Sequence, residues 1–140
     1  MITLTSLNNI GSMKLYSILN ELILEFASRT EVERSIANHD RIRIYYEGDE
    51  TETPGERFIE PYVLGISKAG NPILRAYQYA GVNDTEQPGW KTFLLDKIRD
   101  WDEVGEVPFR TPISDRISNV PKYNPNGDRS MITIYKQAKF

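Results

Sequence analysis

The sequence contains no cysteine and a single histidine, His39. Without cysteine the chain can form neither disulfides nor thiolate metal sites. With one histidine, a histidine-based zinc site or a His-dependent catalytic triad is not expected. Apolar runs are also short. The longest, Tyr62 to Ile66, falls far short of the roughly 20 residues that a membrane-spanning helix needs. We therefore expect no membrane association, and the absence of a signal-peptide pattern predicts a cytoplasmic location.

The common catalytic and nucleotide-binding motifs are missing as well. No GxxxxGK[ST] loop, GxGxxG turn or GxSxG elbow occurs. Neighbouring carboxylates, such as Asp49 with Glu50 or Asp100 with Asp102, lie in loop-like sequence, where we expect solvated charges. The turn at 124–128 lacks the downstream glutamate of a calcium loop. The sequence therefore predicts a protein that is not an enzyme and needs neither a metal nor a cofactor.

The length and the charge of the chain limit the remaining classes of protein function. The chain has 140 residues, 39% of them hydrophobic and 26% charged, which is typical of one soluble globular domain. Its formal net charge of −3 argues against a protein that binds duplex DNA through its whole surface. Because 17 lysines and arginines are present, a local basic patch is still expected.

The N-terminal part predicts helices. Residues 1–11 resemble a tail or turn, and from Ser12 apolar residues recur every three or four positions between Leu15 and Phe26. This stripe predicts a helix that contacts the rest of the domain, or one that forms a homodimer or binds a protein partner. Thr30 to Glu33 resembles a capping box and predicts a second, short helix that ends near Asn38. We accordingly divide the chain into residues 1–29, a tail with an amphipathic helix, and residues 30–140, a β-domain.

The rest of the chain predicts strands joined by turns. Gly48 to Gly55 is acidic and rich in turn residues, which predicts a solvated hairpin loop. Prolines and glycine in 99–130 predict an irregular segment. The fold class expected is α+β: a small, strongly bent antiparallel sheet or barrel preceded by one or two N-terminal helices. Apolar and aromatic periodicity predicts strands at 41–46, 57–66, 72–79, 90–98 and 130–136.

Cations and aromatic residues gather in the predicted strands. Arginine pairs well with phosphate or carboxylate, and aromatic rings stack on bases of any sequence. On the third strand, Arg75, Tyr77 and Tyr79 share one face by the two-residue period; on the fourth, Lys91 and Phe93 share a face with Lys97. The combination predicts a patch that attracts anions. Its candidate binding residues are Tyr46, Arg57, Arg75, Tyr77, Trp90, Lys91 and Lys97.

At these positions the chain resembles the WYL domain, an Sm/SH3-like β-barrel. The resemblance spans about residues 30 to 110 and rests on motifs whose order and spacing agree with the family. It implies a regulatory module that senses ligands or nucleic acid, with Arg57 matching the family's arginine before the proline and Tyr46 its strand tyrosine. The matching motifs are the Ile42-x-Ile44-x-Tyr46 strand, Arg57-x-x-x-Pro61, Gly70-x-x-x-Leu74-x-Ala76-Tyr77 and Phe93-x-Leu95-Asp96-x-Ile98.

The chain departs from the family at two motifs. Pro72-Ile73-Leu74 keeps only the leucine of the Trp-Tyr-Leu run, and Phe93–Ile98 has Leu94 and Lys97 where the family usually has arginines. No winged helix fits in the first 38 residues.

The leading hypothesis is a stand-alone, non-enzymatic module that binds single-stranded nucleic acid or a nucleotide-like anion. The alternative is a structural or interaction protein in which Glu60 and Asp96 pair with the cations and the Leu15–Phe26 helix mediates assembly.

Overall fold

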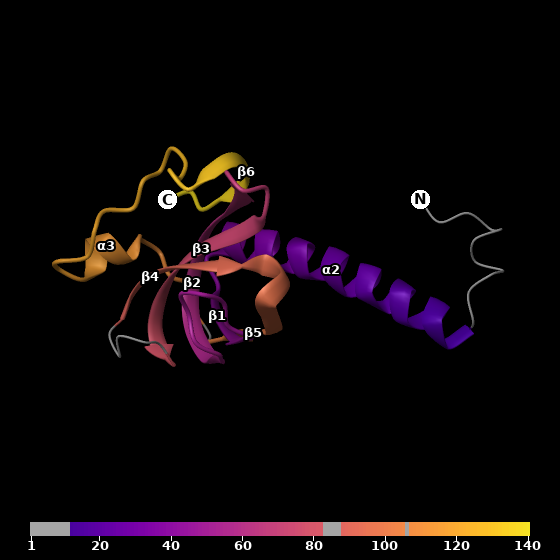
Figure 1. Ribbon diagram of the computed structural model, residues 1–140. Helices are drawn as coiled ribbons and strands as arrows, with labels where there is room; N and C mark the ends of the chain where they lie inside the picture. Colours follow the sequence, from indigo (N-terminus) through magenta and orange to yellow (C-terminus); the bar gives the residue numbers. More distant parts are fainter. Residues whose placement is uncertain (1–11, 83–87, 106) are drawn as a thin grey trace.

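The computed structural model of the protein describes residues 12–82, 88–105 and 107–140 (Figure 1). The predicted tail at 1–11 lies outside these residues. The five predicted strands are present with adjusted ends, and one strand and one short helix are additional. In chain order the elements are α2 (Ser12–Asn38), β1 (Arg41–Tyr46), β2 (Gly55–Ser67), β3 (Pro72–Gly81), β4 (Gly89–Leu94), the 3-10 turn η1 (Leu95–Lys97), β5 (Ile98–Val104), α3 (Ile113–Arg116) and β6 (Met131–Gln137).

All six strands belong to one antiparallel sheet. The strand order is β4-β3-β2-β1-β5, and β6 pairs with β2. The 13-residue strand β2 is the centre of the sheet, because it pairs with β1 through 55–59 and with β6 through 63–67 on the same edge. In the described part of the chain, no pairing joins β4 to β5. The protein is therefore mostly β, as a small antiparallel sheet, and the predicted closure into a barrel is not confirmed.

One continuous helix replaces the two that the sequence predicted. α2 runs for 27 residues without interruption, and the Thr30–Glu33 pattern lies inside it. The prediction of a separate second helix was wrong because a capping-box sequence is also compatible with a helix interior. Since residues 12–38 contain no glycine or proline, nothing in the sequence breaks the helix there.

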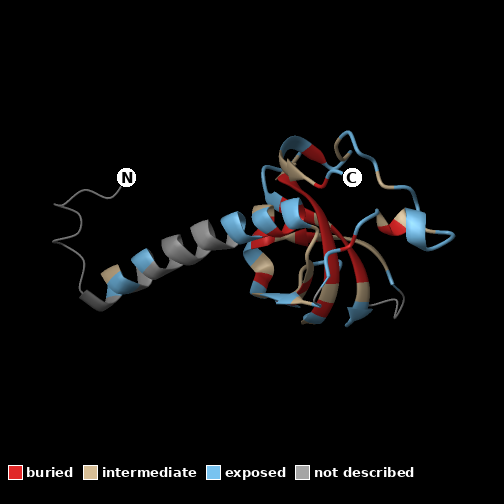
Figure 2. Ribbon diagram, turned by 180° about the vertical axis from the view of Figure 1, so that it is seen from behind, coloured by how far each residue is buried: buried red, intermediate tan, exposed pale blue. Residues whose placement is uncertain are grey.

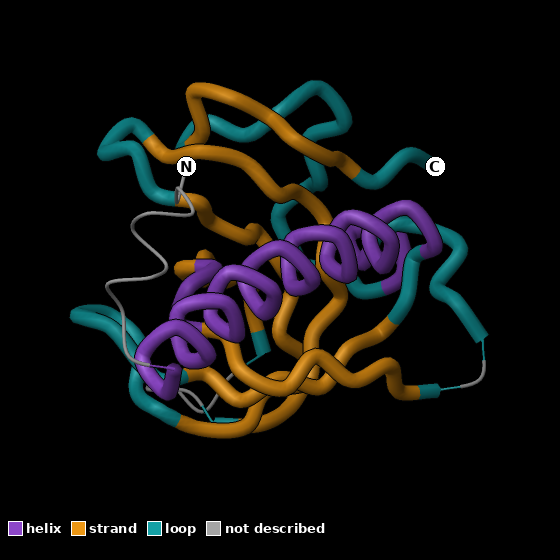
Figure 3. Tube along the Cα trace, turned by 90° about the vertical axis from the view of Figure 1, so that its right-hand side faces the viewer, coloured by secondary structure: helices purple, strands orange, loops and turns teal. Residues whose placement is uncertain are grey.

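The C-terminal third of α2 holds the helix against the sheet (Figure 3). Val32, Ser35 and Ile36 are buried, and the indole nitrogen of Trp101 in β5 donates a hydrogen bond to Ser35 Oγ at 3.0 Å. The N-terminal part extends beyond the sheet (Figures 1 and 2), and Tyr16 on it is 75% exposed. Four side chains of the predicted apolar stripe lie outside the described residues: Ile18, Leu22, Ile23 and Phe26. No helix in the described ranges has the length and apolar character needed to cross a membrane.

The predicted strand 90–98 ends early: residues 90–94 lie in β4, 95–97 form the 3-10 turn η1, and Ile98 begins the additional strand β5. β5 then pairs with β1 at the other edge of the sheet. The segment expected to be irregular therefore begins with a strand. Its sequence, with Asp100, Asp102 and Glu103, is polar because most of its side chains are exposed at the edge, and that composition hid the strand from a search for apolar alternation.

The two faces of the central strands pack against different partners. One face, called here the core face, buries aliphatic residues such as Ile44 and Ile59 together with Tyr46 and Phe93. The opposite face is covered by the segment that follows β5 and by the C-terminus. There Tyr62 lies at the centre of an aromatic cluster, with ring centroids 4.8 to 6.0 Å from those of Trp90, Phe109, Tyr123 and Phe140.

Candidate ligand-binding groove

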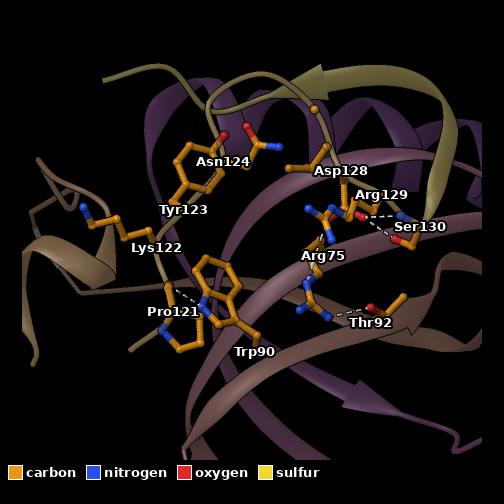
Figure 4. Close-up of a pocket in the computed structure, with 12 residues that line it drawn as sticks. Arg75, Trp90, Thr92, Pro121, Lys122, Tyr123, Asn124, Asp128, Arg129 and Ser130 are labelled. Atoms are coloured by element: carbon orange, nitrogen blue, oxygen red, sulfur yellow. Dashed lines mark hydrogen bonds and ion pairs between the residues drawn. The ribbon is translucent and has the colours of Figure 1, made fainter. Parts of the chain in front are cut away.

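A groove of about 570 Å³ opens between the sheet and the segment before β6 (Figure 4). The sheet provides one wall, with Arg75 of β3 and Trp90 and Thr92 of β4. The other wall is the loop before β6. The residues lining the groove are Val63, Arg75, Trp90, Thr92, Pro121, Lys122, Tyr123, Asn124, Gly127, Asp128, Arg129 and Ser130.

Trp90 is the aromatic centre of the groove. Its ring lies nearly parallel to that of Tyr123, with centroids 6.4 Å apart and planes at 18°. Its indole nitrogen donates a hydrogen bond to the Pro121 carbonyl at 3.2 Å, which ties the loop wall to the sheet wall. Tyr77 supports Trp90 from behind in an edge-on contact at 5.6 Å. Together with the edge-on contact to Tyr62, these contacts fix the indole, while the residue remains partly exposed.

Arg75 lies beside this aromatic centre. Its guanidinium carbon lies 5.8 Å from the Trp90 ring centroid, and Nη1 donates a hydrogen bond to Thr92 Oγ1 at 2.9 Å. Its side chain is 36% exposed. Lys122 and Arg129 on the opposite wall are both exposed. Three cations and one carboxylate, Asp128, therefore line the groove of a chain whose net charge is negative.

The loop wall is fastened to the domain by hydrogen bonds. Tyr123 donates from its hydroxyl to the Ala138 carbonyl at 2.7 Å, and its backbone N–H donates to Ser114 Oγ at 3.1 Å. Burial raises the pKa of Tyr123; a hydrogen bond from Gln137 opposes this rise and the charge of Asp128 adds to it. The hydroxyl thus stays protonated and remains a donor at neutral pH. The groove is built into the fold rather than formed by a free loop.

Three predicted site residues instead form a cluster on the core face. Arg57 is fully buried, and Nη1 donates to Glu52 Oε2 at 3.1 Å and to Gln78 Oε1 at 3.0 Å, while Nη2 donates to the Thr53 carbonyl. Lys91 Nζ lies 3.4 Å from the other oxygen of Glu52. The expectation of a solvated loop at 48–55 was therefore wrong for Glu52, whose side chain is only 11% exposed.

Tyr46 belongs to the same buried cluster and does not offer a stacking surface. Its ring is fully buried in an edge-on contact with Phe93, 4.8 Å between centroids. Its hydroxyl donates to Asp49 Oδ2 and accepts the Leu94 N–H at 2.9 Å. Burial raises the pKa of Tyr46, and the hydrogen bond to Asp49 raises it further. Tyr46 thus helps hold the 48–55 loop on the domain.

The seven predicted residues therefore separate into groups. Arg75, Trp90 and the supporting Tyr77 meet at the groove, whereas Tyr46, Arg57 and Lys91 meet on the core face. Lys97 lies in η1, where the strand alternation has ended, and does not line the groove. Sequence reasoning missed Lys122, Tyr123 and Arg129, because they lie in an irregular segment whose position depends on tertiary contacts. The only signal there was Lys122 and Tyr123 between two prolines, with Arg129 a few residues further along.

Glu60 pairs with other cations than those that the sequence predicted. Glu60 is 2% exposed and accepts hydrogen bonds from Arg41 Nε at 3.2 Å, Arg116 Nη2 at 2.5 Å and the Tyr62 hydroxyl at 2.7 Å. It therefore binds two arginines outside the predicted set. Burial raises the pKa of Tyr62, and the charge of Glu60 raises it further, so the tyrosine remains a donor.

Comparison with protein families gives one match. A model of the WYL domain matches residues 29–103. The chain belongs to the WYL domain family. Searches of curated proteins and of solved structures gave no significant match. WYL domains are regulatory domains that sense ligands or nucleic acid. The match includes Arg75, Trp90 and Thr92 on the sheet wall and ends before the loop wall at 121–130, so the groove combines a WYL sheet with a segment outside the matched region.

Proposed function

We propose that this WYL domain is a non-enzymatic regulatory or accessory module that binds single-stranded nucleic acid or a nucleotide-like anion in the groove. The observation that carries the proposal is the position of the Arg75 guanidinium beside the Trp90 ring in an open groove. An arginine guanidinium can bind one phosphate through two parallel hydrogen bonds. An indole can stack on any nucleic-acid base. Lys122 and Arg129 add positive charge along the opposite wall. A cytoplasmic location suits such a ligand and is part of the proposal.

The proposal excludes Arg57 and Lys91 from direct contact with the ligand. Both are already paired with Glu52, and Arg57 is fully buried. A phosphate could reach them only if the 48–55 loop left its place. The groove cations, by contrast, are reachable in the structure as it stands. Arg75 should therefore contribute to binding, and Lys97, which lies away from the groove, should not.

Fluorescence polarisation with labelled eight-nucleotide DNA and RNA single strands tests the proposal. We expect binding that weakens steeply with salt, because phosphate contacts release counterions. Arg75→Gln should lower the affinity and reduce the salt slope by about one unit. Lys97→Gln is the matched control and should behave like the unmodified protein. No binding of either oligonucleotide or of free nucleotides, or equal binding by the two variants, would overturn the proposal.

A second function, protein interaction, is favoured by the projecting helix α2. Tyr16 and Leu19 on it are exposed, at 75% and 43%. An isolated helix segment is only marginally stable in water unless an apolar face is covered, so we propose assembly through α2, as a homodimer or with another protein. Light scattering at several concentrations tests self-assembly: a dimer should dissociate on Leu19→Glu. A monomeric mass at all concentrations would exclude the homodimer.

A further inference from the structure

Asp128 places a carboxylate inside an otherwise cationic groove. Its Oδ1 accepts hydrogen bonds from the backbone N–H of Ser130, at 2.8 Å, and from the Ser130 hydroxyl. Its Oδ2 lies 3.9 Å from Arg75 Nε, which makes an ion pair but is too far for a hydrogen bond. Within the described residues, Oδ2 therefore has no hydrogen-bond donor, although the side chain is largely buried at 17% exposure. This oxygen lies on the side of the carboxylate that faces Arg75.

The spare oxygen restricts the kind of group that can lie next to it. An ionised carboxylate only accepts hydrogen bonds, so a ligand must present a donor there and keep its own anionic group nearer to Arg75, Lys122 or Arg129. A simple phosphate or sulfate has no such donor when fully ionised. A ligand that satisfies both requirements carries an anion and hydroxyl or amino groups a few ångströms apart.

Among nucleotide groups, a ribose diol fits this arrangement better than a base edge. Guanine would bind a carboxylate through two parallel N–H donors, which requires both carboxylate oxygens. Here Oδ1 is already occupied by Ser130. The two lone pairs of Oδ2 can instead accept two neighbouring hydroxyls. Acidic side chains bind ribose hydroxyls in the same chemical manner in dinucleotide-binding folds.

We infer that Asp128 selects ribonucleotides by accepting hydrogen bonds from the 2′- and 3′-hydroxyls, while Arg75 with Arg129 or Lys122 binds the phosphate and Trp90 stacks on the base. This inference rests on the proposed function and narrows it. Both hydroxyls are free only in a mononucleotide or in the 3′-terminal nucleotide of an RNA. The ligand class is therefore a ribonucleoside monophosphate or an RNA 3′ end. A groove of about 570 Å³ is within the usual range for a small-molecule site.

The first experiment varies only the ligand, so that it does not depend on the folding of a variant. Isothermal titration of the unmodified protein compares adenosine 5′-monophosphate with its 2′-deoxy and 2′-O-methyl forms. We expect the ribonucleotide to bind about tenfold or more tightly, because a hydrogen bond to a charged acceptor is lost in the other two. Equal affinities would overturn the selection by Asp128 and leave the proposed function intact. No binding of any nucleotide or oligonucleotide would overturn both.

The second experiment assigns the preference to Asp128. Asp128→Asn keeps an oxygen for Ser130 and replaces the spare acceptor with an amide donor, so the ratio of ribonucleotide to deoxyribonucleotide affinity should fall close to one. Since the variant also removes a negative charge, the phosphate affinity itself should not fall. Asp115→Asn, at an exposed position in α3, is the matched control and should keep the full ratio. An unchanged ratio in Asp128→Asn would contradict the inference.

Discussion

The carboxylate of Glu52 joins the two cations Arg57 and Lys91 on the core face. Its Oε2 accepts from Arg57 Nη1 at 3.1 Å, and its Oε1 lies 3.4 Å from Lys91 Nζ. Arg57 reaches this carboxylate from the interior, with Gln78 and the Thr53 carbonyl as further partners. The acidic 48–55 loop thus neutralises charges that the strands turn inward. Without it, two cations would be buried with no anion beside them.

We predict that Glu52→Gln destabilises the fold substantially. Removing one partner of a buried ion pair leaves the other charge uncompensated, which costs roughly 3–5 kcal/mol in other proteins. Because glutamine still accepts one hydrogen bond and the site is not wholly closed, the lower end of that range is expected. Urea unfolding measures the free energy of unfolding. Glu50→Gln, at an exposed position of the same loop, is the control, and equal midpoints for the two variants would show that the cluster does not stabilise the protein.

Asp49, in the same loop, should make a contribution to fold stability that depends on pH. Burial by itself would raise the pKa of Asp49, but hydrogen bonds from the Tyr46 hydroxyl and from Thr51 and Glu52 outweigh it and hold the pKa below its ordinary value. A carboxyl whose folded pKa is depressed stabilises the fold above its unfolded pKa, about 3.9, and loses that contribution as the pH falls through the folded pKa.

The prediction is therefore a stability difference that disappears in acid. At pH 7 we expect Asp49→Asn to be less stable than the unmodified protein. As the pH falls below about 4 and through the lowered folded pKa, the two curves should converge, since the carboxyl is then protonated in both the folded and the unfolded chain. Thermal unfolding from pH 7 to pH 2.5 measures this, with Glu50→Gln as the control. A difference that stays constant across the range would show that the effect is not linked to ionisation.

Arg116 connects the groove wall to the sheet. It donates from Nη2 to the buried Glu60, and the Tyr62 hydroxyl accepts the Ile113 N–H at 2.9 Å, so both contacts hold α3 against β2. We expect Arg116→Gln to lower the free energy of unfolding by about 1–3 kcal/mol, as for other hydrogen bonds to charged groups. Nucleotide binding should weaken as well, because α3 precedes the loop wall of the groove.

Urea unfolding and the polarisation assay measure the two effects of Arg116→Gln. Arg110→Gln is the control, since Arg110 is exposed and lies in the same segment. A loss of stability with unchanged binding would show that the loop wall holds its position without α3. An unchanged stability would contradict the role assigned to the pair with Glu60.

Much of the sheet could be predicted from the sequence, and the reasons are local. Ile42, Ile44 and Tyr46 alternate because one face of β1 is buried, and Arg75 and Tyr77 both reach Trp90 by the same two-residue period. The end of β4 at Leu94 and the separate strand β5 after η1 could not be predicted, because β5 depends on its pairing with the distant β1. Periodicity along one segment contains no information about its partner.

The candidate site was less predictable than the fold, for a physical reason. Cations beside aromatic residues attract an anion whether that anion is a ligand or a side chain of the same protein. The sequence could not distinguish Arg57, which Glu52 neutralises, from Arg75, which borders a groove. The distinction depends on which loop folds over which face. The loop wall from Pro121 to Ser130 is irregular, and only its tertiary hydrogen bonds reveal its place.

Gly65 provides a test of the pairing between β2 and β6. A Cβ atom at this position would lie 2.2 Å from the Thr133 carbonyl oxygen and 2.7 Å from Met131 Sδ. Gly65→Ala therefore cannot be accommodated without moving β6, and overpacking of this kind typically costs about 1–3 kcal/mol. Gly89→Ala is the control, since nothing lies within 4 Å of a Cβ there. We expect urea unfolding to show the loss for Gly65→Ala alone, together with faster hydrogen exchange of the amides that pair β6 with β2. If both variants unfold at the same midpoint, β6 does not lie against β2 as closely as this register requires.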